Sequence, residues 1–167
     1  SEGAFGVIAE ATLKIYRQTK ATITRVAGFP DLPAAIAALR QFREAQRGGG
    51  ISTLVEQRLV PREMLLSTIP RLAESFPEAM KFLLVLRAEG ETDDVERHMA
   101  SACALSRGQG GNVAEDDLPE WWAGRFGSFP AAGLGKGPRI MIVAMVPFAR
   151  MAEAYSLVEA FGGKHGL

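Results

Sequence analysis

The sequence predicts an α+β fold, a ferredoxin-like open antiparallel sheet covered by helices. Strand-like and helix-like segments alternate along the 167 residues, an order that layers helices over one sheet. The 47% hydrophobic content can fill a core, and this length fits one domain. The rival is a parallel Rossmann sheet. No Gly-x-Gly-x-x-Gly opens a helix after a strand, and the glycines at 133–137 precede a predicted strand, which is the wrong order for phosphate binding.

Each element is predicted from its period and its flanking residues. Residues 22–29 alternate and are rich in β-branched side chains, which is typical of a strand, and Asp31 is a suitable N-cap for the helix that follows. Residues 81–89 are apolar on both faces and predict an interior strand. The predicted strands are 22–29, 51–60, 81–89 and 139–147, and the predicted helices are 31–46, 62–69, 91–106, a tryptophan-bearing 116–126, and 149–161.

The chain also opens on a strand-like segment. Gly3 and Gly6 precede a run in which every second residue is apolar, which predicts a half-buried strand entered through a glycine turn. The alternating apolar residues are Val7, Ala9, Ala11, Leu13 and Ile15.

This opening, Ser-Glu-Gly-Ala-Phe-Gly-Val-Ile-Ala-Glu-Ala-Thr, resembles the Gly-Ser-Glu-Gly-Thr-Leu-Gly-Ile-Ile-Thr-Glu-Ala-Thr signature of the FAD-linked oxidases, flavoproteins of the vanillyl-alcohol oxidase type. The resemblance implies that residues 1–18 end an FAD-binding domain and that residues 19–167 form a substrate-binding cap domain, incomplete at its C-terminus. Shorter similarities follow in family order: Gly28-Phe29-Pro30, Leu84 to Gly90, Gly110-Gly111, Trp121-x-x-x-Arg125-Phe126 and Val146-Pro147-Phe148.

The resemblance also implies a cofactor contact. In the intact parent the backbone of this opening lies against FAD, and glycines without a Cβ permit such a close approach. The residues concerned are Glu2, Gly3, Ala4, Phe5, Gly6, Val7 and Ile8. Because the other walls of the pocket belong to the missing FAD domain, we do not expect FAD to bind to this fragment.

Arg58 is the candidate substrate-binding residue. Gln57-Arg58-Leu59-Val60-Pro61 is similar to the Ile-Arg-Leu-Met-Asp of the synthase branch, where the arginine reaches the active site, although Pro61 replaces the acid. A guanidinium can bind a carboxylate or a phosphate with two parallel hydrogen bonds, so either kind of small-molecule substrate is compatible. The alternative is a surface arginine paired with Glu56.

The sequence predicts no catalytic residue and no metal site. Trp121, Trp122 and Arg125 could line an apolar pocket, but an anchor for a small core is the favoured interpretation. Arg87 and Glu89 suit a structural ion pair. His98 and His165 lack a ligand pattern and are interpreted as a solvated helix flank and a helix end, Cys103 has no base, and Met141, Met145 and Met151 are interpreted as core fillers.

Composition narrows the function classes. Nineteen basic residues balance nineteen acidic ones, which does not favour nucleic acid, and the longest apolar stretch, 140–148, is too short to span a bilayer as a helix. A single cysteine fits a reducing, cytoplasmic compartment. The resemblance to the FAD-linked oxidases implies the cap of an FAD-dependent oxidoreductase acting on a hydroxy acid or related alcohol, inactive alone, whose partner is the FAD domain of its own chain.

Two alternatives remain. The first is an FAD enzyme similar to alkyl-dihydroxyacetone-phosphate synthase, which the Trp-x-x-x-Arg-Phe similarity suggests. The second is a free-standing ferredoxin-like ligand-binding or dimerisation module. A truncated cap would also expose an apolar surface, so the sequence leaves a homodimer open.

Overall fold

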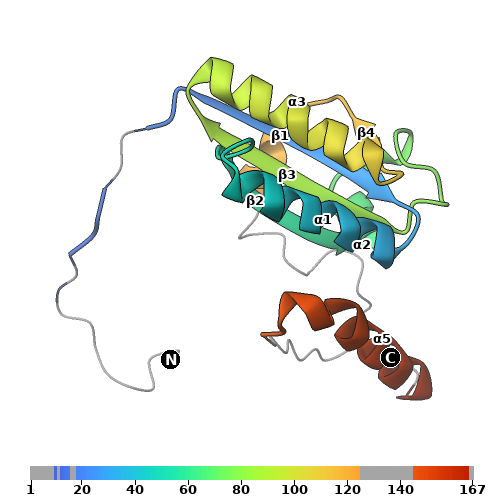
Figure 1. Cartoon of the computed structure of the whole chain (residues 1–167). Coiled ribbons are helices and arrows are strands. Elements are labelled where there is room, and N and C mark those ends of the chain that lie inside the picture. Colours follow the sequence, from blue (N-terminus) through green and yellow to red (C-terminus); the bar gives the residue numbers. More distant parts are fainter. Residues whose placement is uncertain (1–9, 11, 16–17, 125–144, 166–167) are drawn as a thin grey trace.

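A computed structural model describes residues 10, 12–15, 18–124 and 145–165 (Figure 1). Its sheet has the strand order β2-β3-β1-β4, and all three neighbouring pairs are antiparallel. Two β-helix-β units with interleaved strands give this order, so the predicted ferredoxin-like α+β fold is confirmed. The elements are β1 (Ala21–Phe29), α1 (Leu32–Arg47), β2 (Leu54–Pro61), α2 (Arg62–Thr68), the 3-10 helix η1 (Pro70–Ala73), β3 (Phe82–Gly90), α3 (Thr92–Gly108), β4 (Asn112–Ala114), α4 (Pro119–Gly124), the 3-10 helix η2 (Phe148–Arg150) and α5 (Met151–His165).

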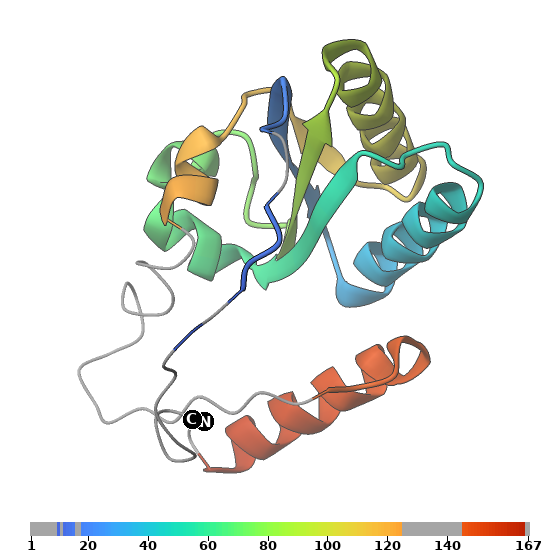
Figure 2. The ribbon, with the colours of Figure 1, turned by 90° about the vertical axis from the view of Figure 1, so that its left-hand side faces the viewer.

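Helical segments cover both faces of the sheet. Figure 2 shows α1 and α3 on one side and α2, η1 and α4 on the other. The first side encloses a core, here the first core, around Phe29, Phe42 and Leu86. The opposite side encloses a second core around Val26, Phe76 and Val85. The two middle strands therefore bury side chains on both of their faces.

β3 is the most buried strand, as its apolar run predicts. Residues 83–88 are all buried, and β3 pairs along its length with β1 and β2. Local signals also hold at α1, where Asp31 Oδ1 accepts a hydrogen bond of 2.8 Å from the Ala34 amide. Because a strand buried on both faces cannot alternate in polarity, a continuous apolar run was the correct signal for β3.

The predicted opening strand is not found in the part of it that the structure describes. Residues 12–15 are irregular, and the side chains of Leu13 and Ile15 are 80% and 90% exposed. No strand in the described ranges pairs with them, and an unpaired strand has no ladder to hold it. Residues 1–9 and 11, which include the cofactor-binding candidates Glu2 to Ile8, lie outside the described residues.

The fourth strand that the structure describes is one that the sequence does not predict. Residues 139–144 lie outside the described residues, and residues 145–147 are in no strand. Met145 is 99% exposed, so its interpretation as a core filler is wrong, whereas Met151 is partly buried. The fourth strand is β4, which pairs with residues 26–28 of β1. Three residues are too few to show a period, so the sequence could not reveal it.

The last helix, α5, contacts the rest of the domain near its N-terminal end. Tyr155 of α5 meets Phe82 of β3 edge to face, with 5.4 Å between the ring centroids, and Arg43 of α1 lies 4.8 Å above the Phe148 ring. Val158 and Leu157 of α5 are exposed. The Tyr155 contact therefore lies in the first turn and a half of α5.

Candidate functional site

The face of the sheet that carries the second core is polar at one end. Five side chains form this polar patch: Thr24 of β1, Glu56 and Arg58 of β2, and Arg87 and Glu89 of β3. Antiparallel pairing places Glu56 beside Arg87, and Arg87 beside Thr24. Because alternate residues of a strand share one face, Arg58 and Glu89 lie on the same side as these three.

Arg87 lies at the centre of the polar patch and is buried. Its Nε donates a hydrogen bond of 2.7 Å to Glu89 Oε1, and its Nη1 donates one of 3.3 Å to Thr24 Oγ1. The predicted ion pair between Arg87 and Glu89 is therefore present. Since a buried guanidinium must be matched by acceptors, this pair has a clear structural purpose.

Arg58 lies at the edge of the polar patch with 39% of its side chain exposed. Its Nη2 is 2.9 Å from Glu56 Oε1, and its guanidinium carbon is 5.6 Å from the centroid of the Trp121 ring. The acid and the ring each attract the guanidinium and restrict its position. The pairing with Glu56 expected under the surface alternative is present, and the role of Arg58 in substrate binding stays a prediction.

Two polar groups beside Arg58 are buried without a hydrogen-bond partner among the described residues. Both carboxylate oxygens of Glu56 are buried, and the contact with Arg58 is an ion pair whose angles do not form a hydrogen bond. The Trp121 Nε1 donor is likewise buried without an acceptor. An unsatisfied buried polar group lowers the free energy of unfolding by about 1–3 kcal/mol. These two groups therefore do not stabilise the fold, which makes their surroundings a candidate functional site.

Asp117 places Trp121 beside Arg58. Its Oδ1 accepts hydrogen bonds from the Thr24 amide at 2.7 Å and from the Leu118 amide at 3.0 Å. The carboxylate thus replaces a strand partner for β1 just beyond the end of β4. Arg71 of η1 donates to the Asp117 carbonyl oxygen at 3.2 Å, which ties α4 to η1. Trp121 is buried in the second core, as the favoured interpretation predicts. The Trp122 side chain and Arg125 lie outside the described residues.

The sequence analysis identified Arg58 but missed the polar patch around it. A signal for the patch exists in the sequence. Glu56-x-Arg58 and Arg87-x-Glu89 are oppositely charged pairs on alternate residues of two strands, and the antiparallel register places Glu56 opposite Arg87 and Val85 opposite Arg58. The anchor Asp117 follows a strand too short to predict and has no comparable signal.

His98 is buried, which corrects its interpretation as a solvated helix flank. Its Nδ1 lies 3.0 Å from Thr53 Oγ1. His98 shares the inward side of α3 with Val95 and Ala102, because residues three and four apart lie on one side of a helix. The side chain of His165 lies outside the described residues. Within the described ranges, no group of three His, Cys, Asp or Glu side chains could hold a metal ion.

Cys103 is a buried thiol in α3. Burial raises its pKa above the ordinary value of 9.0, against a smaller lowering by Arg107. A higher pKa leaves less thiolate at a given pH, and the thiolate is the reactive form.

We expect iodoacetamide to label Cys103 much more slowly in the folded chain than in urea. The labelling rate of the folded chain should still rise as the pH is raised above 9, and intact mass measures the labelling. Equal rates in both states would contradict this burial.

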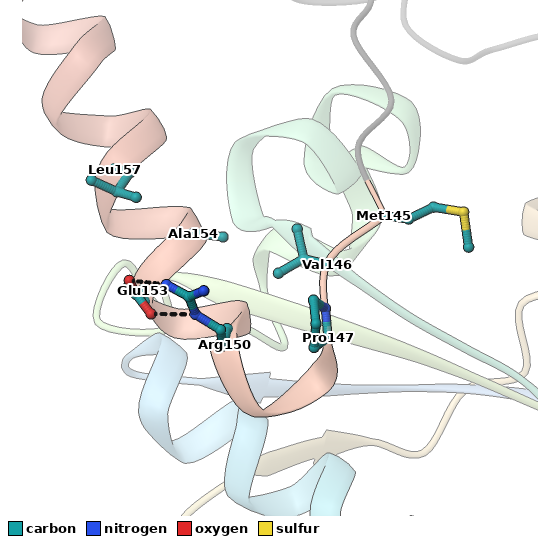
Figure 3. A pocket seen from close by; sticks show the side chains of 7 residues that line it. All are labelled: Met145, Val146, Pro147, Arg150, Glu153, Ala154 and Leu157. Carbon is teal, nitrogen blue, oxygen red and sulfur yellow. Dashed lines mark hydrogen bonds and ion pairs between the residues drawn. The ribbon is translucent and has the colours of Figure 1, made fainter.

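The described cavities are shallow. They measure about 140, 270 and 260 Å³, below the ~300–1,000 Å³ of pockets that enclose small molecules. Figure 3 shows the smallest, beside α5, where Arg150 and Glu153 pair with each other among apolar side chains such as Val146 and Leu157. None of these three cavities is by itself large enough to enclose a group of the size of FAD. No helix in the described ranges is both long and apolar enough to cross a membrane.

The fold and the polar patch define a ferredoxin-like α+β domain with charged side chains on one sheet face. The family model for the C-terminal domain of FAD linked oxidases matches residues 18–167, and the chain belongs to this family. A search of curated proteins finds no match.

Two structures of alkyldihydroxyacetonephosphate synthase, from different crystal forms, are similar to this chain. They have TM-scores of 0.56 and 0.53 and sequence identities of 20% and 19%. The alignments cover 74% and 73% of this chain but only 26% and 25% of the synthase chains. At this identity the similarity supports the fold alone.

Proposed function

We propose that this chain is the substrate-binding part of an FAD-dependent oxidoreductase and that Arg58 binds an anionic group of the substrate, a hydroxy acid or related alcohol. One observation supports the role of Arg58 above the others. Its guanidinium is partly exposed yet held in place by Glu56 and Trp121. Of its five N–H donors, those not directed at Glu56 have no acceptor among the described residues, so they are available to a ligand.

Family membership suggests separate roles for the cofactor and for this chain. The parent's FAD would supply the redox chemistry, and the residues of this chain would bind and orient the substrate. The contact of Glu2 to Ile8 with FAD is part of the same proposal. We further propose that the FAD-binding domain of the parent protein covers the apolar side chains near the start of the chain. Leu13 and Ile15 are two strongly exposed apolar side chains close together in the chain, and a covering domain would remove both from water, which supports this proposal.

The second candidate is an enzyme similar to alkyl-dihydroxyacetone-phosphate synthase. The fold similarity and the Trp121-x-x-x-Arg125-Phe126 similarity favour it. Both candidates require an anion at Arg58, and they differ in whether that anion is a carboxylate or a phosphate.

Glycolate, a small 2-hydroxy acid, is a suitable probe for Arg58. We expect it to shift the NMR signals of the Arg58 Nε–H and the Trp121 indole N–H in the labelled chain, with weak but saturable affinity. Arg58→Gln removes the charge-assisted pair and should weaken this binding by about tenfold or more. Arg40→Gln, on the exposed side of α1, is the matched control and should leave it unchanged. Equal binding to wild type and Arg58→Gln, or the absence of saturable shifts at Trp121, would refute the role of Arg58.

A further inference from the structure

We infer that Glu56 is a specificity-determining residue that makes Arg58 selective for a singly charged carboxylate over a doubly charged phosphate. This inference rests on the proposed function, because it assumes that Arg58 binds the substrate's anionic group. It goes further by naming the charge of that group and the residue that selects it.

The charges of the polar patch cancel. Arg58 pairs with Glu56 at 2.9 Å, and Arg87 pairs with Glu89 at 2.7 Å. Two positive and two negative side chains leave no net charge. A ligand is therefore attracted only by the local arrangement of these charges. A site built for a phosphate dianion would be expected to carry an excess of positive charge.

The position of Glu56 penalises a dianion more than a monoanion. Any anion bound to Arg58 lies within a few ångströms of the Glu56 carboxylate, because the two side chains are themselves in contact. The repulsion from Glu56 is twice as large for a dianion. The attraction to Arg58 also doubles, but the cost of removing the ligand from water grows with the square of its charge. The balance therefore favours the monoanion.

Burial strengthens this selection. Both oxygens of Glu56 are buried, so water and salt screen their charge less than they would on the surface. Among the described residues no hydrogen-bond donor offsets the charge, apart from the ion pair with Arg58 itself. The negative charge is thus offset by Arg58 and the neighbouring Arg87, and water screens little of its repulsion on a ligand bound to Arg58.

The test compares glycolate with glycerol 3-phosphate at slightly alkaline pH, where the phosphate monoester is a dianion. Titration of the wild-type chain, followed through the Trp121 indole signal, should give tighter binding of glycolate. Glu56→Gln keeps the shape of the side chain and removes its charge. We expect it to shift the affinity ratio toward glycerol 3-phosphate by about tenfold or more.

Two further variants separate the charge of Glu56 from its packing and from the total charge of the chain. Glu56→Asp keeps the charge and should keep the preference for glycolate, even where packing suffers. Glu78→Gln removes an exposed acid in the loop before β3 and should leave the ratio unchanged.

The outcomes separate the inference from the proposed function. If Arg58→Gln does not weaken either ligand, the proposed function fails. If Arg58 is required but wild type prefers glycerol 3-phosphate, or Glu56→Gln leaves the ratio as it was, Arg58 remains the anchor and Glu56 is not the selector.

Discussion

Phe29→Ala lowers the free energy of unfolding by about 3–5 kcal/mol, the range observed when a buried phenylalanine is truncated. Phe29 ends β1 and is fully buried in the first core. Its ring is so close to the chain at Gly111 that a Cβ there would lie 2.8 Å from the ring's Cε1. The cavity left by the ring cannot be filled by neighbours that are themselves fixed in the sheet and helices. Urea unfolding, followed by circular dichroism, measures the loss.

Val55→Ala is the matched control for this prediction. Val55 lies on the edge strand β2 and is 56% exposed, so its truncation leaves no cavity. We expect a change of about 0.5 kcal/mol or less. A loss below about 1 kcal/mol in Phe29→Ala would contradict the packing described for the first core.

Gly28→Ala lowers the free energy of unfolding by about 1–3 kcal/mol through overpacking, although it adds a single methyl group. The new Cβ would lie 2.5 Å from Phe76 Cδ1 and 3.2 Å from Leu83 Cδ2. Both of these side chains are fully buried in the second core, so neither can move aside freely. Urea unfolding again measures the effect.

The control for Gly28→Ala is a glycine with free space around it. No atom lies within 4 Å of a Cβ added at Gly108, the last residue of α3, so Gly108→Ala should not destabilise the chain. A double variant with Phe76→Leu makes room for the new methyl group. The double variant should lose less free energy of unfolding than the two single variants lose together. Strict additivity of the two losses would show that Phe76 is not the side chain that obstructs the new methyl group.

Local signals in the sequence determine part of the fold but not all of it. The apolar run of β3 and the N-cap of α1 depend on local signals, and both were predicted correctly. Helices were also predicted over 62–69 and 116–126, where α2 and α4 lie, but the 3-10 helix η1 is too short to show a period, and no local pattern indicates that these segments together cover the second face of the sheet. Residues 12–15 show the opposite case, in which a strand-like alternation forms no strand because a strand also needs a partner.

The candidate site divides in the same way. Arg58 was identified through a family resemblance, but its contact with Trp121 joins segments that are far apart in the chain. Such a contact depends on strand register and on the anchoring of α4 by Asp117, and neither is encoded in a local pattern. The charge that Glu56 adds to the site could be recognised only once its oxygens were known to be buried.

The central pairing of β1 with β3 has a consequence for the chain as it is made. Thr24 and Arg87, which meet across this pair, are 63 residues apart. At a synthesis rate of about 5–20 residues per second, β1 waits about 3–13 s for its partner. During that time α1, β2, α2 and η1 are made, so β1 gains helices that can cover its faces but no strand along either of its edges. The newly made chain is therefore exposed to misassociation through the free edges of β1 until β3 is made.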